Sequence, residues 1–229
     1  MAAQHHDAAD NRRTAVLLYE KSSQRRLRLI VAVMRHSALS SCPGCGALFP
    51  PHDGPTHRYL GASAGCWALF SWSVVSGGAD VTSLVAQSRI PDSVVPAPAR
   101  SDALSLDPLF GDAYGVQHHG EDSPQAIQSV AAHLLDLHAI ITGQTTRPGW
   151  AIGRAVRTRG VFHKLAPPPL GSALTYRHLF PGGGVVTPVT RSQYVVSVYE
   201  AWMALHRSTV EQWYERYVVP DQILGVRPR

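Results

Sequence analysis

Three cysteines and a histidine fall within one short stretch of sequence that is rich in glycine and proline. Cys42 and Cys45 flank a Pro-Gly dipeptide, eleven residues separate Cys45 from His57, and eight separate His57 from Cys66. Two thiolates on either side of a tight turn can ligate one zinc ion, and an imidazole and a third thiolate complete a tetrahedral shell. The spacing predicts a Zn²⁺ site with Cys42, Cys45, His57 and Cys66 as ligands.

Two other interpretations of these cysteines are open. Cys66 precedes Trp67 at the start of an apolar segment, and free cysteines are often small buried residues without a ligand. A Cys-x-x-Cys pair can also be a redox pair, but such pairs lie at a strand-to-helix turn in a βαβ context, which this sequence does not predict. Three cysteines are a poor disulfide framework, so we expect a reducing, cytoplasmic setting.

A second group of polar residues lies in the middle of the chain. Asp112 and His118 precede the Ser-Pro pair at Ser123, and His133 follows inside the next segment. Imidazole and carboxylate side chains can act as an acid/base pair or as metal ligands, because histidine titrates near neutral pH and a carboxylate orients it. We therefore predict Asp112, His118 and His133 as catalytic residues, with Asp112 as base or orienter and His118 as acid, base or ligand of a second ion.

The alternative for the histidines is a structural role. His133, His138 and His206 fall on or beside apolar helical faces, where a lone histidine is commonly a hydrogen-bonded core residue. Asp136 lies on the polar face of the same segment as His133, which predicts a solvated carboxylate.

The elements that position these residues are expected to be helices. A hydroxyl N-cap at Ser123 followed by Pro124 begins a helix that should run to Gly143. Helices are also predicted over 191–217 and, in two pieces broken at Gly77-Gly78, over 66–90. The strand signal at 185–189 is short and contains a proline, which disfavours a strand.

The expected architecture is therefore all-α, with a single helical domain and an irregular zinc-knuckle segment near its N-terminus. Residues 1–40 are predicted to be a basic helical extension, partly disordered, and 41–219 the helical domain. The zinc segment occupies 41–66 of that domain, and 220–229 form a tail.

The positive charge is concentrated at the start of the chain. The formal net charge is +5, and residues 1–40 hold seven basic groups and three acids, which is +4 of that total. The remaining residues are nearly neutral, which argues against nucleic acid as the main partner. No apolar run approaches the roughly 18 residues that a membrane span needs, so we expect no membrane partner.

The ordered motifs are specific enough to compare with a family. The segments Cys-Pro-Gly-Cys-Gly at 42–46, Asp-Gly-Pro-Thr-His-Arg-Tyr at 53–59, Gly-Cys-Trp-Ala at 65–68, Asp-Ala-Tyr-x-Val-Gln-His at 112–118 and Ser-Pro-Gln-Ala-Ile-Gln-Ser-Val-Ala-x-His-Leu at 123–134 carry the comparison. Together they resemble an uncharacterised bacterial family known as a domain of unknown function.

The resemblance implies which residues belong to the family pattern, and it implies no established activity. These residues are Cys42, Cys45, His57, Cys66, Asp112, His118 and His133. The chain departs from the pattern at His119, where the family usually has proline in Gln-His-Pro-Gly. This departure makes the turn less rigid and adds a donor beside the expected site.

Two function classes follow from these features. The first is a bacterial zinc protein that is an enzyme or enzyme subunit acting on a small polar metabolite, in a biosynthetic pathway. The alternative is a structural-zinc interaction protein, or an accessory partner of an enzyme, that offers Trp202, Trp213 and Tyr214 to a protein partner. The sequence leaves open whether the protein is itself a catalyst.

Overall fold

The structure is a computed structural model that describes residues 39–75, 81–91, 96–99, 106–180 and 189–219. The chain divides into two units, Met1–Ala38 and Leu39–Arg229, and every described residue lies in the second. The predicted basic extension, apart from its last two residues, and the tail lie outside the described residues. Most of the stretch at 185–189 does too.

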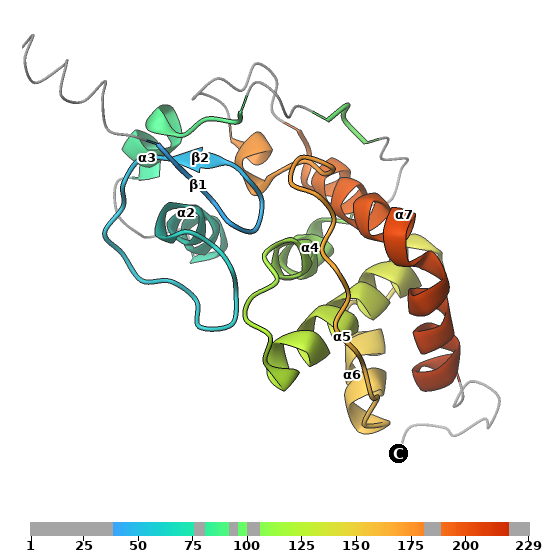
Figure 1. Cartoon of the computed structure of the whole chain (residues 1–229). Helices are drawn as coiled ribbons and strands as arrows, with labels where there is room; N and C mark the ends of the chain where they lie inside the picture. The colour runs from blue at the N-terminus through green and yellow to red at the C-terminus, as the bar shows by residue number, and fades with distance from the viewer. Residues whose placement is uncertain (1–38, 76–80, 92–95, 100–105, 181–188, 220–229) are drawn as a thin grey trace, which may run out of the picture. The chain divides into compact units, whose positions relative to one another are not determined.

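The described residues are mostly helical and carry one two-stranded sheet, which confirms the predicted all-α class. Figure 1 shows the order along the chain. The elements are β1 (Ser40–Ser41), β2 (Leu48–Phe49), α2 (Ala64–Val75), α3 (Val81–Gln87), α4 (Phe110–Gln117), α5 (Pro124–Ile141), α6 (Trp150–Arg157) and α7 (Arg191–Tyr217), with short 3-10 helices at Asp107–Leu109 and Tyr176–Leu179.

Helix α5 is the central element of the described fold. It packs against α4, α6 and α7. The Ser123 hydroxyl accepts the backbone N–H of Ala126 at 3.2 Å, and Pro124 occupies the first helical position, as predicted. Gly143 follows the helix with a φ of +73°, which ends it where the sequence analysis expects.

Helix α7 begins at the predicted residue with a complete capping box. Thr190 accepts from the N–H of Gln193, and the Gln193 side chain accepts from the N–H of Thr190. Its aromatic residues face the core: Trp202, Trp213 and Tyr214 are only 2%, 4% and 5% exposed. The partner surface expected from these three residues is therefore buried inside the protein.

Asp136 is buried, which contradicts the expectation of a solvated carboxylate. Its side chain is 0% exposed and accepts the N–H groups of Gly149 at 2.6 Å and Ala151 at 3.0 Å. These N–H groups open α6 and have no partner within that helix. Asp136 thus caps α6 from α5, and burial raises the pKa of its carboxyl.

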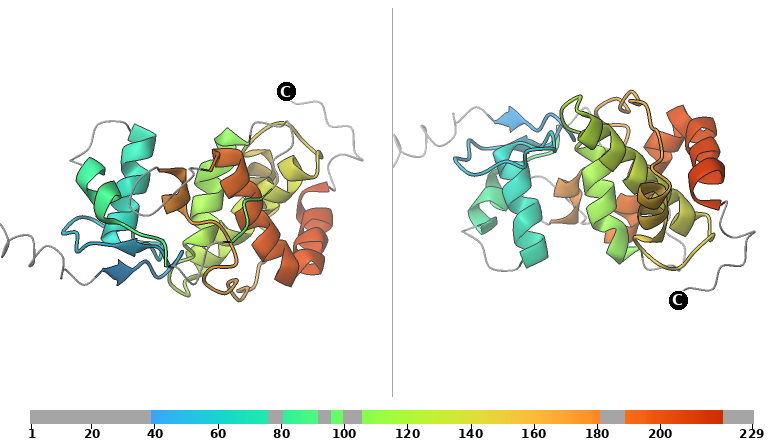
Figure 2. Two further views of the ribbon diagram at one scale, coloured as in Figure 1. Left: turned by 90° about the horizontal axis from the view of Figure 1, so that it is seen from above. Right: turned by 90° about the horizontal axis from the view of Figure 1, so that it is seen from below.

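The N-terminal part of the described chain is the hairpin β1–β2 followed by α2 and α3. The strands pair antiparallel with Ser40 opposite Phe49, and the Cys-Pro-Gly-Cys-Gly turn joins them. Helices α2 and α3 flank the predicted break at Gly77-Gly78, which itself lies outside the described residues. In both views of Figure 2 the hairpin, α2 and α3 lie to one side of α4–α7.

Within the described part of the chain, no helix combines the length and the apolar character needed to cross a bilayer.

Candidate metal centre and adjoining cavity

Four buried side chains converge where the hairpin and α2 meet the end of α4. The ligand atoms of Cys42, Cys45, Cys66 and His118 all lie within 4.8 Å of one another. Cys42, Cys66 and His118 are 0% exposed, and Cys45 is 3% exposed. These four residues are a Cys₃His set that can bind a metal ion, and we call them the metal group.

The distances within this group fit a tetrahedral ion. With Zn–S near 2.3 Å and Zn–N near 2.05 Å, tetrahedral geometry places two sulfurs about 3.8 Å apart and a sulfur and nitrogen about 3.6 Å apart. The Sγ atoms of Cys45 and Cys66 are 4.0 Å apart, and Cys66 Sγ lies 3.3 Å from His118 Nε2. Shifts of a few tenths of an ångström would bring these pairs to zinc distances.

The hydrogen bond on the far side of the His118 ring leaves Nε2 free for the ion. His118 Nδ1 lies 2.9 Å from the carbonyl oxygen of Tyr114, and because a carbonyl only accepts, Nδ1 carries the proton. The Nε2 lone pair then faces the cysteines. Ligating histidines commonly hold their other ring nitrogen in this way.

Tyr114 supports the centre from a second side. Its hydroxyl donates to Cys66 Sγ at 3.6 Å, and its ring stacks on the His118 ring with centroids 3.9 Å apart. The backbone N–H of Ser63 donates to Cys42 Sγ at 3.4 Å. If a metal ion were bound, these donors would reduce the negative charge on the thiolate sulfurs.

Two glycines allow the chain to close around the centre. A Cβ at Gly44 would lie 2.6 Å from the His118 ring and 2.8 Å from its Cα, so only glycine permits this approach. Gly46 has a φ of +77°, which completes the turn between the strands. The N–H of Gly61 donates to the carbonyl of His118 at 2.9 Å and ties the loop after β2 to the end of α4.

The metal-free thiols differ in acidity. Burial raises the pKa of the Cys45 and Cys66 thiols. Hydrogen bonds from Cys45, Cys66 and His118 lower the pKa of the Cys42 thiol. A bound cation would favour deprotonation of all three thiols.

His57 lies outside this group, although the sequence analysis predicts it as the fourth ligand. Its ring packs against Trp67 with centroids 4.9 Å apart, and its Nδ1 accepts the N–H of Tyr59 at 3.3 Å. The position expected for His57 is occupied by His118, which the sequence analysis assigns to catalysis. The structure therefore joins three of the four predicted ligands with one of the predicted catalytic residues.

Asp112 on α4 and His133 on α5, two of the three predicted catalytic residues, contact each other directly. His133 Nδ1 donates to Asp112 Oδ1 at 2.7 Å. The side chains are 30% and 16% exposed, respectively, so the pair is partly open to solvent. In the neutral ring, Nε2 of His133 is then an unprotonated acceptor.

His133 opens onto a cavity of about 300 Å³ beside the metal group. The loop after β2 contributes His57, α2 contributes Trp67 and Phe70, and α4 contributes Gly111 and Tyr114. Pockets of about 300–1,000 Å³ accommodate small-molecule ligands. His118 faces the metal group and does not line this cavity, so the three predicted catalytic residues do not share one pocket.

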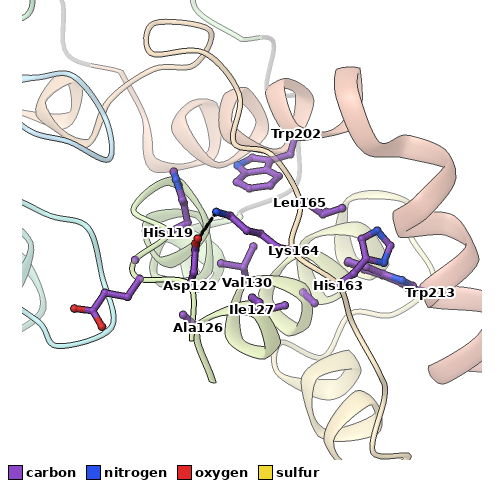
Figure 3. Close-up of a pocket in the computed structure, with 13 residues that line it drawn as sticks. His119, Asp122, Ala126, Ile127, Val130, His163, Lys164, Leu165, Trp202 and Trp213 are labelled. Carbon is purple, nitrogen blue, oxygen red and sulfur yellow. Dashed lines mark hydrogen bonds and ion pairs between the residues drawn. The ribbon is translucent and has the colours of Figure 1, made fainter. Parts of the chain in front are cut away.

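A slot on the other side of α5 is too small for a metabolite. Figure 3 shows it between α5, the segment at 163–165 and α7, with Lys164 paired to Asp122 at its edge. Its volume is about 30 Å³, room for about one water molecule. Its walls are mainly packed apolar side chains such as Val130 and Trp202.

Several cavity residues carry no recognisable signal in the sequence. Trp67 and Phe70 read as part of an apolar helix, and their position on the wall depends on how α2 meets α4. A weak signal exists on α5, where Gln125, Ser129 and His133 recur every four residues and all line the cavity.

Comparison of the chain with protein-family models, with curated proteins and with solved structures gives no match. The fold and site define the class: a helical protein with a buried Cys₃His group that can bind a metal ion and a cavity beside it.

Proposed function

We propose that the protein is a zinc-binding enzyme or enzyme subunit in which zinc is structural and the cavity at His133 acts on a small polar metabolite. The observation that carries the proposal is the Asp112–His133 pair, joined at 2.7 Å, with His133 lining a cavity of about 300 Å³.

Zinc is the ion that the donor set favours. Three thiolates and one imidazole suit Zn²⁺ in a tetrahedral site. A complete set of four protein ligands is typical of structural zinc, since catalytic zinc keeps a position for water or substrate. Cys42, Cys45, Cys66 and His118 would hold the ion, and the ion would neutralise thiolate charge and fix the knuckle to α4.

The chemistry is therefore assigned to the cavity. His133 Nε2 accepts a proton from the bound metabolite, and the Asp112 carboxylate orients the ring and stabilises the imidazolium that forms. The partial exposure of the pair lets the proton pass on to solvent. This assigns His133 as general base, Asp112 as positioning residue and His118 as metal ligand.

The test is a search for a metabolite that the protein converts. Zinc-loaded protein is incubated with a polar extract of bacterial cells, and the extract is compared by mass spectrometry before and after. We expect at least one metabolite to change, and the change to slow about 100-fold or more in His133→Gln, since general acid/base catalysis contributes roughly 10²–10⁴-fold.

His163→Gln is the matched control, because His163 is exposed and lies outside this cavity. It should convert the metabolite at the wild-type rate. An extract left unchanged by the wild-type protein, or changed equally by His133→Gln, would contradict catalysis and favour the interaction-protein alternative.

A further inference from the structure

His57 lines the same cavity as His133. Its Nδ1 accepts the N–H of Tyr59 at 3.3 Å, so in the neutral ring the proton sits on Nε2. His133 has the opposite arrangement, because its Nδ1 donates to Asp112. The two imidazoles that line the cavity thus offer one Nε2–H donor and one Nε2 acceptor.

Four aromatic side chains, Tyr59, Trp67, Phe70 and Tyr114, line the cavity together with the two histidines. Trp67 lies against His57. It also stacks on Phe70, with ring centroids 5.5 Å apart and planes 28° apart. Tyr114 and Tyr59 contribute two more rings. Aromatic faces favour a flat unsaturated ring over a saturated one of the same size, because stacked π-systems gain beyond simple burial.

The lining also excludes strongly charged ligands. None of the described residues that line the cavity is an Asp, Glu, Lys or Arg, and the Asp112 carboxylate beside His133 is already paired. Phosphate and carboxylate groups are normally bound by arginine, lysine or clustered backbone donors. The ligand is therefore expected to be polar and uncharged.

We propose that the cavity binds a planar heterocycle containing a cyclic amide, with the ring N–H donating to His133 Nε2 and the adjacent carbonyl accepting from His57 Nε2–H. The proposal names the ligand class for the cavity and rests on the proposed function for any turnover of that ligand. His57 is then a ligand-binding residue that polarises the carbonyl, and Trp67 is the stacking wall.

The stacking and the hydrogen bonding in this proposal can be tested separately with three compounds: uracil, 5,6-dihydrouracil and 1,3-dimethyluracil. They are titrated into zinc-loaded protein and followed by NMR of the histidine ring nitrogens. Uracil should bind most tightly. Dihydrouracil keeps the amide edge but is not flat, and we expect about 3–10-fold weaker binding. Dimethyluracil is flat but has no N–H, and we expect about 5–10-fold weaker binding.

Variants of the cavity give an independent readout. His57→Phe keeps a ring against Trp67 but removes the donor, so uracil should bind about 5–10-fold more weakly. Gly111 lines the cavity, and a Cβ there meets no atom within 4 Å, so the position has room for a larger side chain. Gly111→Leu should abolish uracil binding, whereas the matched Gly111→Ala should retain it.

The inference is overturned if uracil binds no better than dimethyluracil, or if His57→Phe and Gly111→Leu leave its binding unchanged. The proposed function fails separately, when His133→Gln leaves metabolite conversion unaffected. If a metabolite is converted in a His133-dependent way but uracil does not bind, the proposed ligand class is contradicted and the proposed function stands. If uracil binds but no metabolite is converted, the ligand class is supported and the proposal that the protein is an enzyme is contradicted.

Discussion

The three histidines around the centre and the cavity differ in what their Nδ1 atoms contact. Nδ1 donates to a backbone carbonyl in His118 and to a carboxylate in His133, and it accepts a backbone N–H in His57. Because a neutral imidazole carries one proton, these contacts determine whether Nε2 offers a lone pair or an N–H. The same side chain is thus suited to three roles: ligand, base and donor.

Zinc affinity tests whether His118, and not His57, is the fourth ligand. Loss of an outer-shell partner costs roughly 10–100-fold in metal affinity, so loss of the ligand in His118→Ala should weaken zinc binding by at least about 100-fold. His57→Ala should bind zinc within about 3-fold of wild type, as expected for a residue outside the group. Competition with a chromophoric chelator measures both values.

Circular dichroism serves as the control, because a variant that has lost its helices would lose zinc for an unrelated reason. If a helical His118→Ala protein retains zinc while His57→Ala loses it, the ligand assignment is incorrect.

At the scale of elements, α5 lines the cavity, caps α6 and contributes to the apolar core. Its N-terminal half carries Gln125, Ser129 and His133 on the cavity face, and Asp136 in the next turn caps α6. Its apolar residues pack on α4 and α7. A shift of α5 relative to its neighbouring helices would therefore alter the cavity as well as the core.

The cap from Asp136 should be measurable in the free energy of unfolding. Asp136→Ala leaves two N–H groups at the start of α6 without their acceptor, and we expect a loss of about 2 kcal/mol. Asp136→Asn keeps one oxygen acceptor and should lose less. Asp122→Ala is the matched control, since the Asp122–Lys164 pair is exposed and such pairs contribute about 0–1 kcal/mol.

Urea unfolding gives the three values on one scale. Equal losses for Asp136→Ala and Asp122→Ala would show that the buried cap does not stabilise α6.

At the scale of the described molecule, the metal group joins a part with little regular structure to a helical part. Between residues 39 and 62 the only strands are the two-residue β1 and β2, and the Cys42 and Cys45 thiols point at His118 at the end of α4. Helices α5 and α7, in contrast, are long regular elements that supply many residues of the apolar core, to which the hairpin adds Ala47 and Phe49. If zinc binds as proposed, the first part is expected to depend on the ion for its stability more than the second.

Removal of zinc by a chelator should therefore act locally. Hydrogen exchange followed by mass spectrometry should show faster exchange in 39–62, with the backbone of α5 and α7 still protected, because the strands of the hairpin are only two residues long and its cysteines would lose their shared ion. Adding zinc back should restore protection. Uniform loss of protection, or none in 39–62, would contradict a structural zinc that stabilises this segment.

Much of the fold follows from local patterns. The caps at Ser123 and the bounds of α7 were predictable, because a helix start depends on residues within one turn. Asp136 was misplaced for the opposite reason: its partners are the N–H groups of another helix, at Gly149 and Ala151, which no periodicity in α5 reports.

The sequence by itself determined the helical class and the three cysteines that can bind a metal ion, because both depend on residue type and short spacing. Only the tertiary structure decided which histidine joins them. His118 is 52 residues beyond Cys66, and α4 has to pack against the hairpin before its imidazole reaches the sulfurs. His57 lies between the cysteines in sequence, but its loop directs it into the cavity with His133.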